Sequence, residues 1–438
     1  MDMIRIEPNM LRGTVQVPPS KSVAHRTMIA AALSGKPCRI HNVAMSKDIC
    51  ATLACLNALG VEVHAEEEKK DVYFTGKRRK TLPDTLTLDC GESGSTLRFL
   101  MPLSLLMGKK VHLTGQGRLM QRPQKPYQDL FTQKGISYIS NEDSIDIFGT
   151  LQSGLFRLPG NVSSQFITGL LYALPLLEGE SEIQLTTLLE SKGYVDLTLQ
   201  VLEDFGIKIH HDNYRRFVIP GNQQYQPKDY TVEGDYSQAA FFLVADALGC
   251  DIAVSGLNPD SLQGDKKILD IIRETGAEIQ TMHDGTLKVR RTACMHGFQA
   301  DAREIPDLVP ILAVLAAFCQ GESLIYGAGR LRMKESDRLA ATSRELRQMG
   351  IDIFEGADFL RIQGTQAAKS TTVSSWNDHR IAMASAIAAC RAEGTVTICD
   401  AKSAVTKSYP DFFEIYQNLS TGPRTLLGGK DIITEEEL

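Results

Sequence analysis

The segment Leu346-Arg347-Gln348-Met349-Gly350-Ile351-Asp352-Ile353 decides the fold, because versions of it recur along the chain. In each copy an amphipathic stretch ends at a glycine, and alternating apolar and polar residues follow. A glycine after the last helical residue readily takes the left-handed conformation that closes a helix, and alternation is typical of a strand. Each copy therefore predicts a helix followed by a strand. Successive closing glycines are separated by 75, 71, 70 and 74 residues, and they are Gly60, Gly135, Gly206, Gly276 and Gly350.

A second series of helices alternates with the first. Its members are apolar stretches, most of them rich in alanine, and each is preceded by a short polar opening; they lie at 24–33, 97–106, 166–177, 239–248, 308–318 and 381–390. One unit of roughly 70 residues thus has two helices and several short strands, and six units predict three per domain. We expect the alanine-rich helices inside each domain and the strands outside. The predicted domains are 20–232, and 1–19 together with 233–420, followed by a flexible tail at 421–438.

Length, charge and cysteine spacing exclude several classes of protein. A chain of 438 residues is too long for one ordinary core, and its net charge of −6 gives no general attraction to nucleic acid. The nine cysteines lack the spacing of a disulfide framework or a zinc site. The start lacks the apolar core of a signal peptide, and the longest apolar run, 308–318, is too short to span a bilayer. We predict a reduced, cytoplasmic protein with no metal, nucleic acid or membrane partner.

The polar openings indicate sites for anions. Free N–H groups and the helix dipole favour negative charge at a helix N-terminus, although a Ser there is equally explained as an N-cap. That alternative stays open for Ser22, Ser95, Ser164 and Ser237. Basic residues near a helix start are different, because the dipole opposes them, and several of them together indicate bound anions. They are Lys21, Arg26, Arg98 and Arg380, with further cations in loops at Arg118, Arg122 and Lys407.

The segment Gly329–Leu339 gathers four cations around Glu335. If the segment begins as a strand, Arg330, Arg332 and Lys334 share one face. If the next turn is helical, Lys334 and Arg338 are neighbours that repel each other. Either arrangement indicates a phosphate or carboxylate ligand, and Glu335 could carry a proton among these cations. A salt-bridged helix start is the alternative for this segment taken alone.

Asp307 follows a proline at a predicted helix start, so it is either a cap or a general base. His25 and His379 are more typical of hydrogen-bonded core residues than of catalysts. The chain lacks the glycine-rich nucleotide-binding motifs, the serine-hydrolase elbow and the zinc-protease motif.

Taken together, these motifs resemble the enolpyruvyl transferases, and within them the 5-enolpyruvylshikimate-3-phosphate synthases. The resemblance extends from about Pro18 to Phe413. It rests on Pro19-Ser20-Lys21-Ser22 with Arg26, Gly94-Ser95-Thr96-Leu97-Arg98, Arg122-Pro123, Ser163-Ser164-Gln165-Phe166, Ser191-Lys192-Gly193-Tyr194, Glu233-Gly234-Asp235, Pro306-Asp307, Lys334-Glu335-Ser336-Asp337-Arg338-Leu339, Asn377-Asp378-His379-Arg380 and Lys407.

The resemblance implies a two-domain, inside-out α/β barrel of six βαβαββ-type units, three per domain, with the active site in the interdomain cleft. It implies transfer of the enolpyruvyl group of phosphoenolpyruvate to the 5-hydroxyl of shikimate 3-phosphate, with loss of phosphate from a tetrahedral intermediate. This is a step of chorismate and aromatic amino acid biosynthesis, and the family is the target of glyphosate. No metal or organic cofactor is implied, and we expect a monomer.

By position, Asp307 matches the family's proton acceptor, Glu335 its proton donor, and Lys21 a residue that touches both substrates. The shikimate 3-phosphate site, on the side of the 20–232 domain, is matched by Lys21, Ser22, Arg26, Ser163, Ser164, Gln165, Ser191, Tyr194, Asp307 and Lys334. The phosphoenolpyruvate site is matched by Lys21, Gly94, Arg122, Gln165, Arg338, Arg380 and Lys407.

The chain departs from the family pattern at Glu92, Gly193 and Arg330. Arg330 stands where some members of the family have a polar residue that contacts substrate, so the resemblance does not extend to a substrate contact by Arg330. Because Gly94 is the small residue beside the phosphoenolpyruvate site, we expect sensitivity to glyphosate. Two alternatives are a UDP-N-acetylglucosamine enolpyruvyl transferase and a non-catalytic phosphometabolite-binding protein on the same fold. The first usually has Lys-Asn where this chain has Lys21-Ser22, and the second would lack Asp307 or Glu335.

Overall fold

A computed structural model describes residues 2–290, 292, 294–420 and 426–428. The chain divides into two compact units, each treated by itself below. Unit 1 comprises Met1–Pro18, Gly234–Ser261 and Asp265–Leu438, and unit 2 comprises Pro19–Glu233 and Leu262–Gly264. Most of the segment 421–438, predicted as a tail, lies outside the described residues.

Each unit has three four-stranded sheets of one pattern within the described residues. The first pair of strands in each sheet is parallel and the other two pairs are antiparallel. The sheets of unit 2, in strand order, are β14 (Tyr230–Thr231), β3 (Pro37–His41), β5 (Asp71–Arg78), β4 (Val61–Glu66); β6 (Thr85–Asp89), β7 (Lys110–Thr114), β9 (Ser144–Phe148), β8 (Ser137–Ser140); and β10 (Gly154–Leu158), β11 (Ser181–Leu185), β13 (Arg216–Ile219), β12 (His210–Asp212).

Unit 1 repeats the same arrangement of parallel and antiparallel pairs. Its sheets, in strand order, are β2 (Arg12–Gln16), β15 (Asp251–Ser255), β17 (Leu287–Arg290), β16 (Glu278–Thr281); β18 (Gln299–Asp301), β19 (Glu322–Tyr326), β21 (Leu360–Gln363), β20 (Asp352–Glu355); and β22 (Thr371–Ser374), β23 (Val396–Cys399), β1 (Met3–Ile6), β24 (Leu426–Gly428).

In two sheets the first strand of the common pattern comes from a distant part of the chain. In unit 1, β2 pairs in parallel with β15, so that Thr14 lies opposite Ala253. In unit 2, β14 pairs in parallel with β3, so that Tyr230 lies opposite Ile40. Each of these strands takes the place of the first strand in the common pattern. The chain therefore has to leave unit 1 after β2 and return to it after β14.

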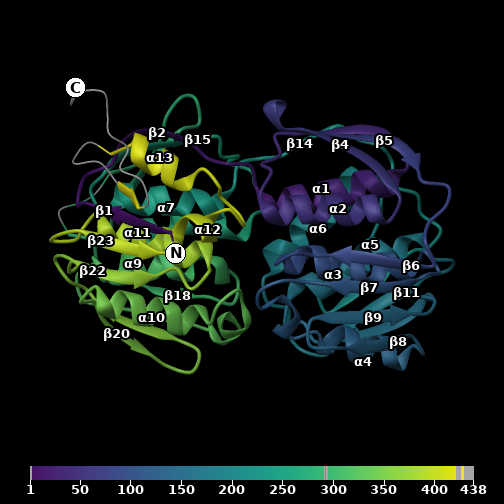
Figure 1. Cartoon of the computed structure of the whole chain (residues 1–438). Coiled ribbons are helices and arrows are strands. Elements are labelled where there is room, and N and C mark those ends of the chain that lie inside the picture. Colours follow the sequence, from purple (N-terminus) through teal and green to yellow (C-terminus); the bar gives the residue numbers. More distant parts are fainter. Residues whose placement is uncertain (1, 291, 293, 421–425, 429–438) are drawn as a thin grey trace. The chain divides into compact units, whose positions relative to one another are not determined.

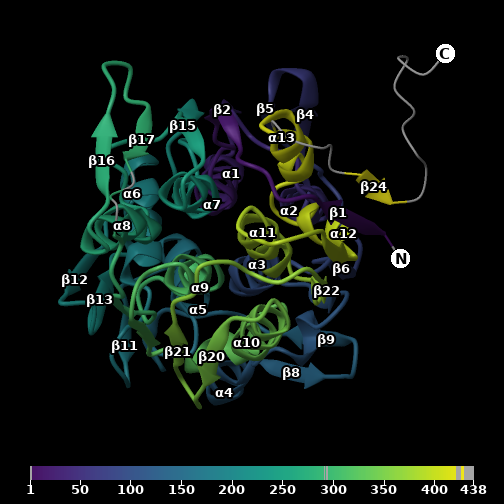
Figure 2. The same ribbon diagram turned by 90° about the vertical axis from the view of Figure 1, so that its left-hand side faces the viewer.

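The alanine-rich helices lie inside their units, with strands around them (Figure 1, Figure 2). Every residue of α7, α9 and α11 is buried. Small side chains allow close helix contacts: a Cβ on Gly169 of α5 would lie 2.3 Å from the carbonyl oxygen of Arg98 on α3. The inner helices are α1 (Lys21–Ser34), α3 (Gly94–Leu105), α5 (Ser164–Ala173), α7 (Tyr236–Ala247), α9 (Val309–Ala317) and α11 (His379–Ala389).

The second helix of a repeat ends as the glycine pattern predicts. The five glycines of the first series have φ angles between 72° and 94°, the left-handed region that favours glycine after a helix. The helices they close are α2 (Lys47–Ala58), α4 (Lys125–Gln133), α6 (Lys192–Asp204), α8 (Ile268–Glu274) and α10 (Arg338–Gln348). Two short helices, α12 (Ala401–Val405) and α13 (Phe412–Asn418), end the described part of unit 1.

These observations confirm the predicted α/β class with six repeats, three in each of the two units. Among the described residues, no helix is long and apolar enough to cross a bilayer.

Asp246 joins α7 to its sheet in unit 1. This carboxylate is buried, and its two oxygens accept the backbone N–H of Ile252 in β15 at 2.9 Å and of Val289 in β17 at 2.6 Å. Burial raises the pKa of Asp246 to about 6. The carboxylate replaces two hydrogen bonds that these N–H groups would otherwise make with water.

We predict that Asp246→Asn destabilises unit 1 at neutral pH. An amide has only one acceptor oxygen, so its own NH₂ group would face one of the two backbone N–H groups that the carboxylate now accepts. An unsatisfied buried donor costs about 1–3 kcal/mol, which for a unit of this size lowers the melting temperature by about 2–10 °C. The measurement is thermal unfolding followed by circular dichroism. The matched control is Asp411→Asn at an exposed position, and an equal shift in both variants would contradict the role of Asp246.

Candidate functional site

The first predicted cation of unit 2 lies at the start of α1. Ser20 is the N-cap, with its side chain accepting from the N–H of Val23 at 3.5 Å, and Lys21 is the first helical residue. The Lys21 Nζ donates to Asp48 Oδ2 on α2 at 2.7 Å. Both side chains are mostly buried, at 19% and 13% exposed. Asp48 therefore offsets the unfavourable helix dipole and directs the Lys21 ammonium group.

Arg26 lies one turn further along α1 and contacts two other predicted residues, Ser22 and Tyr194. Its guanidinium donates to the backbone oxygens of Ser22 at 2.8 Å and Tyr194 at 2.9 Å, and to Thr198 Oγ1 at 2.9 Å. The group is buried and lies 5.2 Å from the ring centre of Phe99. Arg26 thus fixes the start of α1 against the start of α6.

Gly94, Arg122 and Gln165 come together at the starts of α3 and α5. Arg98 Nη1 donates to Gln165 Oε1 at 2.7 Å, and Gln165 Nε2 donates to Ser95 Oγ at 3.0 Å. A Cβ on Gly94 would lie 3.0 Å from Arg122 Nη1 and 3.3 Å from Gln165 Oε1. The absence of a side chain at position 94 therefore lets the Arg122 guanidinium approach the start of α3.

The N-caps are the residues that precede the predicted site serines. The caps of α1, α3, α5, α7 and α11 are Ser20, Ser93, Ser163, Asp235 and Asp378, each with its side chain accepting a backbone N–H. The cap explanation is therefore wrong for Ser22, Ser95, Ser164 and Ser237. Among the predicted site residues, Ser163 caps α5: its Oγ accepts the backbone N–H of Gln165 at 3.3 Å. Ser191 precedes α6 in the left-handed conformation, with φ of 58°.

In unit 1 one buried cation organises the predicted residues. Arg338, the first residue of α10, is only 2% exposed and donates to three carboxylates. Its Nε lies 2.8 Å from Asp378 Oδ2, its Nη1 2.7 Å from Asp307 Oδ1, and its Nη2 2.7 Å from Glu335 Oε2. Burial lowers the pKa of Arg338, but the three carboxylates outweigh burial and raise the pKa above its ordinary value. Arg338 therefore stays charged.

Asp307 is surrounded by three cations from two segments. Its Oδ1 also lies 3.4 Å from Lys334 Nζ, and its Oδ2 lies 3.4 Å from Arg380 Nη2. Arg380 Nη1 donates to the Asp307 backbone oxygen at 3.0 Å. Burial lowers the pKa of Lys334, and the nearby Asp307 acts in the opposite direction. Lys407 Nζ donates to the backbone oxygen of Asn377 at 2.6 Å, beside this cluster.

The local structure of the segment Gly329–Leu339 differs from both predicted arrangements. Residues Gly329–Met333 form a 3-10 turn instead of a strand, Lys334 is extended, and α10 begins only at Arg338. Asp337 is the N-cap and accepts the N–H of Ala340 at 3.0 Å. Lys334 and Arg338 are therefore not repelling neighbours on one helix, and both contact Asp307 instead. Arg330 donates to the backbone oxygen of Arg303 at 2.5 Å.

Sequence reasoning missed three acidic residues of these clusters. Asp48 pairs with Lys21, and Asp378 pairs with Arg338 while capping α11. Asp265 is buried in unit 1, and burial, together with the charge of Asp307, raises the pKa of Asp265 to about 7. Asp378 belongs to the motif Asn377-Asp378-His379-Arg380, so its position beside Arg380 was a usable signal. No motif of the sequence marked Asp48 or Asp265.

The predicted core position of His25 is confirmed: it is buried, with Nδ1 2.8 Å from Thr52 Oγ1. No group of three or more His, Cys, Asp or Glu side chains in the described part of the chain is arranged to hold a metal ion.

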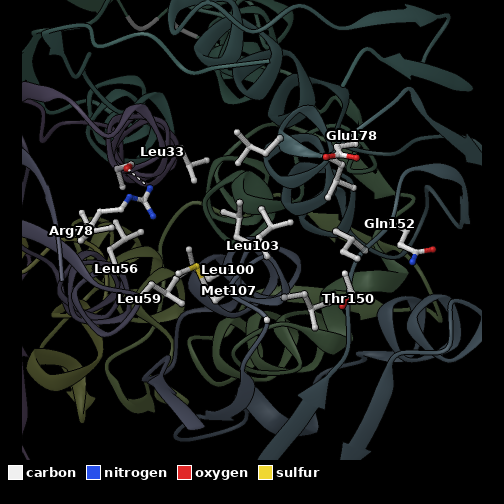
Figure 3. A pocket seen from close by; sticks show the side chains of 18 of the residues that line it. Leu33, Leu56, Leu59, Arg78, Leu100, Leu103, Met107, Thr150, Gln152 and Glu178 are labelled. Carbon is white, nitrogen blue, oxygen red and sulfur yellow. Dashed lines mark hydrogen bonds between the residues drawn. The ribbon is translucent and has the colours of Figure 1, made fainter. Parts of the chain in front are cut away.

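A cavity of about 850 Å³ in unit 2 lies away from these residues. It is lined mainly by leucines near the C-terminal ends of α1, α2 and α3, such as Leu33, Leu59 and Leu103 (Figure 3). None of the predicted site residues lines it. Most of the predicted residues lie instead near helix starts, those of the inner helices α1, α3, α5, α9 and α11 and those of α6 and α10, where the dipole favours anions.

Comparison with known proteins identifies relatives over nearly the whole chain. The sequence profile described as EPSP synthase (3-phosphoshikimate 1-carboxyvinyltransferase) matches residues 6–416. A 3-phosphoshikimate 1-carboxyvinyltransferase of Clostridium novyi is 46% identical over 96% of this chain and 98% of its own length. The enzyme of the same name from Clostridium acetobutylicum is 45% identical over 96% and 97%.

A solved structure supports the fold. The EPSP synthase from Acinetobacter baumannii superposes with a TM-score of 0.78, at 23% identity, over 98% of this chain and 100% of that one.

We predict that Arg338→Met lowers the stability of unit 1 by about 3–5 kcal/mol, because it leaves buried carboxylates without their cation. The measurement is urea unfolding. The matched control is Arg273→Met, which removes an ion pair with Asp270 whose two side chains are 52% and 51% exposed, and which should cost at most about 1 kcal/mol. Equal losses in the two variants would show that the Arg338 cluster contributes no more than a surface pair.

Proposed function

Because the chain belongs to the EPSP synthase family, we propose which of its residues carry out that family's reaction. The protein transfers the enolpyruvyl group of phosphoenolpyruvate to the 5-hydroxyl of shikimate 3-phosphate and releases phosphate. The hydroxyl adds to the substituted vinyl carbon while the methylene carbon gains a proton. Phosphate then leaves from the tetrahedral intermediate while the new methyl group loses a proton, which restores the carbon–carbon double bond. The reaction therefore needs a base, an acid and cations.

In this proposal Asp307 accepts the proton of the shikimate hydroxyl and Glu335 donates the proton to the methylene carbon. The support is geometric: both carboxylates contact Arg338, and Asp307 also lies near Lys334 and Arg380. The cations around Asp307 stabilise its charged form, so this carboxyl group is unprotonated before the reaction and can accept a proton. Both side chains keep partial solvent access, at 17% and 19% exposed, so a substrate can reach them.

The residues that we propose for phosphoenolpyruvate are cations and small or amide groups. Arg338, Arg380 and Lys407 supply the positive charge in unit 1, and Arg122 and Lys21 supply it in unit 2. Gly94 leaves room at the start of α3 where Arg122 and Gln165 meet. Such fixed cations stabilise charge that develops on the departing phosphate.

Shikimate 3-phosphate is assigned mainly to unit 2. Ser22, Arg26 and Tyr194 are linked by the hydrogen bonds of the Arg26 guanidinium, and Ser163 is linked to Gln165. The remaining proposed contacts are Lys21, Ser164, Ser191, Asp307 and Lys334. Several hydroxyl and amide groups near helix starts suit the phosphate and ring hydroxyls of this substrate.

The function is tested by phosphate release on mixing the purified protein with phosphoenolpyruvate and one of two acceptors. We expect release with shikimate 3-phosphate and none with UDP-N-acetylglucosamine. Phosphate release only with the sugar nucleotide would contradict shikimate 3-phosphate as the acceptor, while phosphoenolpyruvate would remain the donor. Absence of release with both acceptors would favour the non-catalytic binding protein. The names of the relatives favour the shikimate acceptor over both alternatives.

Glu335→Gln tests the role of the proposed acid. The amide keeps the shape but has no proton to donate to carbon, so we expect turnover to fall by about 10²-fold or more, with shikimate 3-phosphate binding largely unchanged. Turnover is measured by phosphate release, and binding by calorimetry. Near-normal turnover would remove Glu335 from the mechanism.

Monomeric state, cytoplasmic location, glyphosate sensitivity and independence of any cofactor stay predictions. Gel filtration with light scattering tests the first, and inhibition curves test the third.

A further inference from the structure

The loop between β22 and α11 in unit 1 has a disfavoured backbone. Trp376 and Asn377 are consecutive residues with positive φ, at 55° and 52°. A residue with a side chain loses about 1–2 kcal/mol in this left-handed conformation. The loop also carries functional groups: the Asn377 oxygen accepts Lys407 Nζ, and Asp378 and Arg380 follow directly. Something outside the loop must hold it in this conformation.

Glu345 on α10 contacts the loop with both carboxylate oxygens. Its Oε1 accepts the indole N–H of Trp376 at 2.7 Å, and its Oε2 accepts the backbone N–H of Ser374 at 2.9 Å. Glu345 is only 2% exposed. The nearby charge is Arg344, whose Nε lies 4.0 Å from Glu345 Oε1 and whose guanidinium lies 5.6 Å from the Trp376 ring centre. A carboxylate with two acceptor oxygens matches two N–H donors.

The position of Glu345 on α10 links it to the proposed site. Arg338 and Glu345 are seven residues apart, which is about two helical turns, so both face the same side. Arg338 binds Asp378 at the end of the loop, and Glu345 binds Trp376 and Ser374 at its start. One rigid helix therefore fixes the loop at both ends, with the Asn377 carbonyl between the two contacts.

We propose that Glu345 is a positioning residue for phosphoenolpyruvate: by holding the Trp376–Asn377 turn, it places Arg380 and the Lys407 ammonium group for the anionic donor. This inference rests on the proposed function, in which Arg380 and Lys407 bind that substrate. Glu345 itself is buried behind the loop and acts through these cations. Loss of the contact should weaken the use of phosphoenolpyruvate more than the use of shikimate 3-phosphate, whose proposed contacts lie mainly in unit 2.

The test is Glu345→Gln, which keeps size and shape. The amide can accept one of the two N–H groups but points its own N–H₂ at the other. We expect KM for phosphoenolpyruvate to rise about tenfold, with KM for shikimate 3-phosphate changed by less than about twofold. The control is Glu414→Gln on α13, an exposed position away from the proposed residues, which should leave both constants unchanged.

Trp376 provides a second readout, because it is the only tryptophan of the chain. Its fluorescence therefore reports on this loop alone. Glu345→Gln should shift the emission maximum of the folded protein, whereas Glu414→Gln should not. Trp376→Phe removes the indole donor and leaves the Ser374 contact, so it should raise KM for phosphoenolpyruvate as well. When Trp376→Phe is already present, adding Glu345→Gln should raise KM for phosphoenolpyruvate by a smaller factor than it does in the wild type, since the two residues share one interaction.

Two results would overturn the inference: an unchanged KM for phosphoenolpyruvate in Glu345→Gln, whether or not the emission shifts, or equal rises in KM for both substrates. If Glu345→Gln fails to fold, Trp376→Phe decides by the same comparison of the two KM values. An inactive wild-type protein would instead refute the proposed function. In that case a shifted emission in Glu345→Gln would still support the structural contact, and calorimetry with phosphoenolpyruvate would decide whether that contact governs binding.

Discussion

The contact of Arg338 with three carboxylates is the interaction on which the proposed chemistry of unit 1 depends. Asp378, Asp307 and Glu335 all lie within 2.8 Å of this one buried guanidinium. A planar group with five donors can serve several carboxylates at fixed angles, which an ammonium group cannot do. The same cation thus fixes a helix cap, the proposed base and the proposed acid. This explains why a charge is kept in an almost fully buried position despite the cost of removing it from water.

The helix α10 extends this constraint from single atoms to a whole loop. Its first residue and a residue two turns later bind opposite ends of the segment Ser374–Asp378. The left-handed turn between them is unfavourable by itself, and the buried hydrogen bonds of Glu345 offset that cost. In unit 2, Arg26 plays a comparable part, since it ties the starts of α1 and α6 together through backbone oxygens. In each unit, then, one buried cation holds separate segments together: Arg338 binds side-chain carboxylates, and Arg26 binds backbone oxygens.

Prediction from sequence succeeded where the signal is local. The glycine after each amphipathic helix requires a positive φ, so Gly60 and Gly350 could be recognised without any partner. Basic residues at helix starts stood out because the dipole opposes them. Prediction failed where a role depends on a distant partner. Asp48 looks like an ordinary acidic residue in the first turn of α2 until it is seen 2.7 Å from Lys21. The conformation of Gly329–Met333 was also missed, because the alternation of charged and apolar residues is typical of a strand and gives no signal for a 3-10 turn.

The sequence by itself determined the class of fold, the number of repeats and the residue types of the site, because periodicity and helix-end chemistry act within a few residues. The tertiary structure alone decided which strand completes each sheet, as in the pairing of β2 with β15 from residues far along the chain. It also decided which carboxylate meets which cation, and that Glu345 supports Trp376. Such pairs are set by packing between elements, and the separation of two residues along the sequence does not predict how close they lie in the folded protein.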